Sequence, residues 1–220
     1  MSSLTLKIIA VVTMLVDHIG FLFFPEQAIF RIIGRVAFPL FAFLIAEGFL
    51  KTKDVKEYLK RLSIFAVISQ APFFFFERLA GEINLNLNIL FTLALGVLAL
   101  IFLAKVKNIF VKVIGVLGFL AIAHFGGFSY GIYGILSILG SYLFLKNRKA
   151  GIVTLSVLPL LENVRLFLMN IFFLQFFAMF SLIPIYFYNG KQGPKISRWL
   201  FYWFYPVHMA VLSLIFVIIK

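Results

Sequence analysis

The sequence predicts an all-α integral membrane protein, a polytopic bundle of about nine transmembrane helices with its N-terminus in the cytoplasm. First, 63% of the 220 residues are hydrophobic and only 13% are charged, more apolar surface than a water-soluble core of this size can bury. Second, apolar stretches recur along the whole chain, many near the roughly 20 residues that cross a bilayer core. Third, the basic residues gather in alternate gaps between these stretches. Together these observations exclude a soluble enzyme and a disordered chain.

Each apolar stretch is interpreted as one crossing of a single transmembrane domain that covers residues 1–220. The first is no cleavable signal peptide, because it contains Asp17 and His18 and lacks a small-residue cleavage site before the next stretch. The crossings are expected at residues 4–24, 28–50, 62–76, 88–104, 110–125, 129–145, 150–161, 166–188 and 199–219.

The expected crossing at 150–161 is short, about 18 Å as a helix, and it contains Pro159. We expect it to cross, bent, because a re-entrant segment would leave the basic stretch NGKQGPKISR on the outer side, against the charge pattern. Glu162, Asn163 and Arg165 are then drawn towards the outer leaflet.

The charges between the crossings predict the orientation. Fifteen of the twenty Lys and Arg residues lie at the N-terminus or in alternate gaps: Lys7, Lys51, Lys53, Lys56, Lys60, Arg61, Lys105, Lys107, Lys112, Lys146, Arg148, Lys149, Lys191, Lys195 and Arg198. The other gaps carry Glu26, Glu77, Glu82, Glu162, Arg78, Arg165 and Lys220. This asymmetry places the N-terminus in the cytoplasm and, with nine crossings, the C-terminal end outside.

Composition also limits the partners. With no cysteine, the chain has no disulfide framework, thiolate metal site or cysteine nucleophile, and we expect no metal. The net charge of +12 would indicate nucleic acid in a soluble protein, but here membrane topology accounts for it, so the expected partner is the bilayer and not a nucleic acid.

Ionisable residues inside the crossings are the candidate site. A central Asp or Arg opposes insertion by about 2.5 to 3.5 kcal/mol, so Asp17, Arg35 and Glu47 must be paired, hydrated or turned towards a cavity. His18 and Arg35 fall at similar depth in neighbouring antiparallel crossings, and Arg31 shares a helix face with Arg35. Asp17 points about 100° away from His18 and is better placed to pair with an arginine.

Each of these residues also has a structural interpretation. Asp17 and Arg35 could form a purely structural ion pair, and His18 could be a neutral imidazole hydrogen-bonded between helices. Glu47, near the cytoplasmic end of its crossing, fits an interfacial partner of a loop lysine as well as it fits a site residue. The basic loops are explained by topology alone, although they would also attract a ligand that carries phosphates.

The last crossing and one outer turn add further candidates. In YWFYPVHMAVL, Tyr202, Tyr205 and His208 share one helix face around Pro206, a pattern that an aromatic belt also explains. His124 precedes the glycine-rich turn HFGGFSYGIYG, whose glycines could simply permit a tight turn.

Several motifs carry a resemblance that covers nearly the whole chain. LKIIAVVTMLVDHIG, RIIGRVAFPLFAFLIAEGFL, NILFTLALGVLAL, YGIYGIL and RWLFYWFYPVHMAVL resemble the TraX family, named for an inner-membrane acetylase of the pilin N-terminus. That family is similar to the transmembrane acyltransferases, in which a first-span histidine is held to be catalytic and acetyl-coenzyme A comes from the cytoplasm. The resemblance implies a catalytic His18 with Asp17, Arg35, Glu47 and His208 as further site members.

The chain departs from the family at Ser129, where we expect an Asp before the YG pair, and this suggests a different acceptor. Because the sequence has no GxSxG elbow and no cysteine, direct transfer in a ternary complex is more economical than an acyl-enzyme.

The function predicted is therefore acetyl transfer from acetyl-coenzyme A to an amine or hydroxyl, of a pilin-like peptide N-terminus or another envelope molecule, in a bacterial inner membrane. The catalytic residues predicted are His18, Asp17 and Arg35. The acceptor is expected at Arg31, Glu47, His124, Tyr130, Tyr205 and His208. The coenzyme phosphates are expected at Lys51, Lys53, Arg61, Lys195 and Arg198.

Two other classes stay open at this point. Intramembrane Asp, Arg and His residues also mark the path of a transporter or proton-coupled carrier, although no repeated half is visible. A non-catalytic assembly or scaffold protein would use the same residues only for folding and for retaining its partners.

Overall fold

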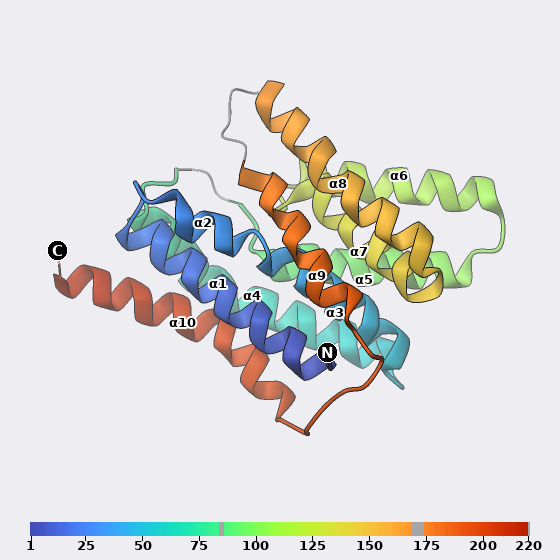
Figure 1. The fold of residues 1–220 in the computed structure, drawn as a ribbon, viewed down its shortest axis with the longest axis horizontal. Helices are drawn as coiled ribbons and strands as arrows, with labels where there is room; N and C mark the ends of the chain where they lie inside the picture. The colour runs from blue at the N-terminus through green and yellow to red at the C-terminus, as the bar shows by residue number, and fades with distance from the viewer. Residues whose placement is uncertain (84–85, 169–173, 220) are drawn as a thin grey trace.

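A computed structural model describes residues 1–83, 86–168 and 174–219 of the chain, and the elements found there are helices (Figure 1). They are α1 (Ser3–Phe23), α2 (Ala28–Gly34), α3 (Ala37–Lys51), α4 (Val55–Leu79), α5 (Ile89–Lys105), α6 (Ile109–Phe125), α7 (Gly131–Lys146), α8 (Arg148–Leu168), a 3₁₀ helix (Leu174–Ser181), α9 (Leu182–Tyr186) and α10 (Arg198–Ile219). One isolated β-bridge joins Leu87 to Phe128.

The helices are those of a multi-pass membrane protein. Five segments are long and apolar enough to cross a bilayer, namely α1, α2 with α3, α4, α8 and α10. Shorter apolar helices are α5, α6, α7 and the segment Leu174–Tyr186. Large apolar side chains point outward on them, such as Phe110 and Ile114 of α6 and Ile218 of α10, which is stable in lipid but not in water.

The observed segments follow the expected order, but two of the expected crossings are too short. The crossing expected at 62–76 is shorter than α4, which runs for 25 residues from Val55 to Leu79. The crossing expected at 150–161 is too short, because α8 runs for 21 residues from Arg148 to Leu168. The polar residues that suggested an end have partners inside the helix: the Asn163 side-chain nitrogen donates to the Pro159 carbonyl at 2.8 Å, and Arg165 pairs with Glu162. Of the crossing expected at 166–188, residues 166–168 belong to α8, and 169–173 lie outside the described residues, as does Lys220.

The crossing expected at 28–50 is broken at one point. Helix α2 ends at Gly34, and α3 begins at Ala37 after a turn at Arg35 and Val36. Gly34 lies directly against Asp17 of α1, since a Cβ atom there would come within 2.0 Å of the Asp17 Oδ1 atom. The missing side chain therefore allows α1 and α2 to approach closely.

Figure 1 shows how the helices meet at two ends of the bundle. At one end, which we call the basic end, α1 begins, α3 ends and α4 begins, and the segment before α10 runs alongside the start of α1 through hydrogen bonds from Ser3 to Lys191 and from Leu4 to Gln192. At the opposite end, α1 turns into α2 and α4 ends. Large apolar side chains are fully buried between the two ends: Phe38, Phe43, Phe76, Leu6, Leu40, Leu100, Ile135, Ile138, Ile185 and Met209.

The contact between α7 and α8 gives a test of this packing. A Cβ atom on Gly151 would lie 2.1 Å from the Phe144 Cα atom, and backbone cannot move aside easily. We expect Gly151→Ala to destabilise the protein by about 1–3 kcal/mol and to lower the midpoint of thermal unfolding in detergent. Gly118 of α6 has open space around its Cα atom, so Gly118→Ala is the matched control and should unfold at or slightly above the wild-type midpoint. Equal midpoints for the two variants would contradict the packing described.

Candidate functional site

A cavity of about 290 Å³ lies in the half of the bundle nearer the opposite end. Helices α1, α2, α4 and α10 and the segments before α5 and α7 contribute to its wall. The ionisable and polar side chains that line it are Asp17, His18, Arg31, Arg35, Glu77, Asn86, Ser129, Tyr130 and Tyr205. The other lining residues are Met14, Phe21, Gly34, Ala37, Phe38, Phe41, Phe73 and Ile89. Such a mixture of convergent polar groups and apolar wall is typical of a ligand site.

An ion cluster forms one side of the cavity. The Asp17 carboxylate lies 2.8 Å from Nη1 of Arg31 and 3.6 Å from Nη2 of Arg35, and the Asp17 side chain is only 14% exposed. Arg35 also reaches the Arg31 carbonyl at 3.3 Å and the Gln175 side-chain oxygen at 3.4 Å, and the Arg31 guanidinium lies over the Phe21 ring. The pairing of Asp17 with an arginine is therefore present, and the closer of its two partners is Arg31.

The two histidines of α1 and α10 are in direct contact. Nδ1 of His18 lies 2.7 Å from Nε2 of His208, and Nδ1 of His208 lies 2.7 Å from the Phe204 carbonyl. The imidazole planes are within 16° of parallel, with centroids 5.0 Å apart. His18 lines the cavity, whereas His208 is buried behind it. The structure thus places His208 against the predicted catalytic imidazole instead of in the predicted acceptor site.

Of the other residues predicted at the acceptor, Tyr130 and Tyr205 line the cavity, whereas His124 does not. Tyr130 precedes α7 in a left-handed conformation (φ 62°) and stacks on Phe38 with ring centroids 3.9 Å apart. Tyr205 of α10 is buried and also lines the cavity. His124 is exposed at the end of α6, where its ring contacts Phe125, and it does not line the cavity.

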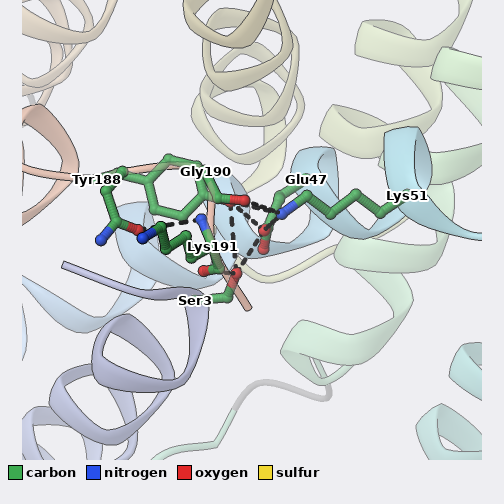
Figure 2. A network of polar contacts seen from close by, with 7 residues as sticks. Ser3, Glu47, Lys51, Tyr188, Gly190 and Lys191 are labelled. Atoms are coloured by element: carbon green, nitrogen blue, oxygen red, sulfur yellow. Dashed lines mark hydrogen bonds and ion pairs between the residues drawn. The ribbon is translucent and has the colours of Figure 1, made fainter. Parts of the chain in front are cut away.

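Glu47 belongs to a different cluster, at the basic end (Figure 2). It is 5% exposed, and its Oε1 atom accepts hydrogen bonds from Ser3 Oγ at 2.5 Å, from Lys51 Nζ at 2.7 Å and from the Tyr188 hydroxyl. Lys51 also donates to the Gly190 carbonyl at 2.7 Å. Burial and the hydrogen bond to this carboxylate raise the pKa of Tyr188. The structure therefore places Glu47 where α1, α3 and the segment after α9 meet, and not in the cavity wall.

The residues expected to hold the coenzyme phosphates all lie at the basic end. Lys51 is paired with Glu47, and Arg61 lies 3.4 Å from Glu57. Lys53, Lys195 and Arg198 are exposed. These five residues do not line the cavity around His18, so their role stays a prediction.

Sequence reasoning missed two residues of the cavity wall, Glu77 and Asn86, and the partner Gln175. Glu77 seemed to lie in an outer gap, but α4 continues to Leu79 and carries it into the wall. In the described part of the chain its carboxylate has no ion-pair partner within 4.0 Å. The sequence did contain one signal for Glu77: it is a single acidic residue directly after the apolar stretch that ends at Phe76. Over the same part of the chain, no group of three or more His, Asp or Glu side chains could hold a metal ion.

Comparison with known proteins now decides the family. The family model described as "TraX protein" matches residues 2–216. The chain belongs to the TraX family. A relative from Dichelobacter nodosus, named "Probable fimbrial assembly protein FimC, serogroup H1", is 33% identical over 96% of this chain and 94% of its own length. The uncharacterized protein RP591 of Rickettsia prowazekii (strain Madrid E) is 36% identical over 41% of this chain and 33% of its own length. No solved structure matches this TraX chain.

The ion cluster predicts a large difference between two acid-to-amide variants. Asp17→Asn leaves two largely buried guanidinium groups without their counter-charge, which costs about 3–5 kcal/mol for a buried pair. Glu57→Gln removes the ion-pair partner of Arg61. Because the Glu57 side chain is 48% exposed, this loss should lower the free energy of unfolding by at most about 1 kcal/mol. The two variants are compared by their midpoints of thermal unfolding in detergent and by the amount of folded protein that each one yields. A wild-type midpoint for Asp17→Asn would show that the cluster does not stabilise the bundle.

Proposed function

We propose that this TraX protein is a membrane-embedded acyltransferase that moves an acetyl group from cytoplasmic acetyl-coenzyme A to an amine or hydroxyl of an envelope acceptor. The observation that carries the proposal is the His18 imidazole in the wall of a polar cavity, beside two guanidinium groups within an apolar bundle. Family membership supports the acetyl chemistry. The printed name of the Dichelobacter relative, a fimbrial assembly protein, fits a pilin-like peptide as one possible acceptor.

His18 is the proposed general base. A neutral imidazole in the cavity wall takes a proton from the acceptor as its nitrogen or oxygen attacks the acetyl carbon. The new bond joins that atom to the acetyl carbon, the carbon–sulfur bond breaks, and the proton leaves with the sulfur. Arg31 and Arg35 are the groups available to stabilise negative charge on the carbonyl oxygen, and Asp17 holds both guanidinium groups in place.

Glu77 favours an amine as the acceptor. Its carboxylate lines the cavity without an ion-pair partner among the described residues, so it can attract the acceptor amine as an ammonium group. The ammonium group releases one proton to solvent, and His18 takes the second proton as the neutral amine attacks. Asn86, Ser129, Tyr130 and Tyr205 also line the cavity and carry hydrogen-bonding groups. We propose these residues, with Glu77, as the acceptor site.

The donor is proposed to reach the cavity from the basic end. Acetyl-coenzyme A supplies an acetyl group activated as a thioester, and only the reacting ends of donor and acceptor fit in about 290 Å³. Lys53, Arg61, Lys195 and Arg198 would hold its phosphates by charge. His18 lies about 22 Å along α1 from Ser3, counted at 1.5 Å per residue, a depth that suits the long arm of this donor.

The catalytic proposal is tested with a substitution that preserves the histidine contact. In His18→Asn, the amide nitrogen can still donate a hydrogen bond to His208, but no basic nitrogen faces the cavity. We expect acetyl transfer to fall by about 10²–10⁴-fold, measured as release of coenzyme A and as label transferred from acetyl-coenzyme A to a peptide with a free N-terminus. Membrane level and unfolding midpoint should stay near wild type. Undiminished turnover by this variant would remove His18 from catalysis.

The same reconstituted protein separates this proposal from a carrier. We expect sealed vesicles to show thioester cleavage that depends on an acceptor. Uptake of a solute into the vesicles with no thioester cleavage would instead support a transporter.

The full topology is also part of the proposal: nine crossings, an N-terminus in the cytoplasm and a multi-pass location in a bacterial inner membrane. The number of crossings is supported by the five long and four shorter apolar segments of the described chain. The orientation is supported by the Lys and Arg residues of the basic end, because basic loops favour the cytoplasmic side. Cysteines introduced at Gly193 and Gly81, each in a loop, test it in spheroplasts. A membrane-impermeant maleimide should label Gly81→Cys and spare Gly193→Cys, and the reverse pattern would invert the orientation and contradict the assigned donor side.

A further inference from the structure

We infer that His208 is the positioning residue of the site, which holds the hydrogen of neutral His18 on Nδ1 and thereby leaves the Nε2 lone pair of His18 for the acceptor. This inference rests on the proposed role of His18 as the base. It specifies which nitrogen of His18 takes the proton and which contact keeps that nitrogen unprotonated.

The direction of the hydrogen bonds starts at a backbone carbonyl. The Phe204 carbonyl can only accept, so the Nδ1 atom of His208, 2.7 Å away, carries a hydrogen. In a neutral imidazole the other nitrogen then has a lone pair, so Nε2 of His208 accepts. Its partner at 2.7 Å, Nδ1 of His18, must be the donor. The remaining nitrogen of His18, Nε2, is left unprotonated.

The surroundings favour two neutral rings. His208 is only 6% exposed, its ring is parallel to the Phe204 ring within 12°, and Phe76 packs edge-on against His18. The charged groups that line the cavity with His18 are Asp17, Arg31, Arg35 and Glu77, and Asp17 is already shared by the two arginines. A permanent imidazolium here would add a positive charge beside two guanidinium groups in a poorly solvated region.

The contact also fixes the orientation of the ring. Because a histidine ring can bind through either nitrogen, its partner decides which nitrogen carries the hydrogen. When His18 takes a proton, its Nδ1–H still donates to His208, which stabilises the imidazolium as it forms. Without the partner, His18 would populate both hydrogen positions and more than one ring orientation, and only part of the population could act as the base.

Two variants of His208 separate positioning from packing. In His208→Gln, a side-chain oxygen can accept from His18 Nδ1, whereas His208→Leu fills similar space with no acceptor. We expect His208→Leu to lower kcat by about 10- to 100-fold with little change in KM, and His208→Gln to stay within a few-fold of wild type. If both variants lose activity only in proportion to folded protein, His208 has a packing role and the inference is wrong.

A spectroscopic readout needs no turnover. The sequence has three histidines, so ¹⁵N-histidine labelling of the detergent-solubilised protein gives few signals, and His18→Asn identifies those of His18. In the wild type we expect the ¹⁵N shifts of a protonated Nδ1 and an unprotonated Nε2 for His18. In His208→Leu we expect the two ¹⁵N shifts of His18 to be averaged between protonated and unprotonated values. A hydrogen on Nε2 of His18 in the wild type would overturn the inference. An inactive protein that nevertheless shows the expected pattern would contradict the acyltransferase proposal and leave the positioning role standing.

Discussion

The structure around the cavity depends on one carboxylate held between two guanidinium groups. None of Asp17, Arg31 and Arg35 could be kept alone in an apolar bundle at acceptable cost, and together they join α1 to the α2–α3 segment. Gly34 allows the two helices to approach, and the turn at Arg35 and Val36 lets both arginines point at the same acid. The polar cavity and the placement of His18 follow from this close contact.

Charge is divided between the two ends of the molecule in a way that suits a two-substrate reaction. The basic end carries exposed lysines and arginines that are not used in packing, while the cavity near the opposite end carries Glu77 without a counter-ion in the described chain. A polyanionic donor and a cationic acceptor would therefore be drawn to different faces of the bilayer. His18 lies between these two regions and lines the same cavity as Glu77.

Much of the fold could be predicted because lipid imposes strong rules on length and charge. Apolar length located the helices, and the cost of burying charge singled out Asp17, His18 and Arg35. What the sequence could not supply depends on contacts that one-dimensional patterns do not contain. The end of α8 was misplaced because the Asn163 side-chain nitrogen and the Arg165 guanidinium find partners within the helix. His208 was predicted at the acceptor, and no spacing reveals that α10 brings its ring against His18 of α1. Glu47 was predicted either as a site residue or as the interfacial partner of a loop lysine, and the structure pairs it with Lys51. Which role either residue has stays a prediction.

The Glu47 cluster has a consequence for how the chain is made. Ser3 and Glu47 are synthesised early, but their hydrogen-bond partners are synthesised some 140 to 190 residues later (Figure 2). Tyr188 donates to Glu47, and the Lys191 carbonyl accepts from the Ser3 backbone N–H. Until that late segment arrives, a carboxylate destined for burial has only Lys51 and Ser3 nearby. The start of the first helix therefore stays without these partners until the segment before α10 has been made and covers it at the basic end.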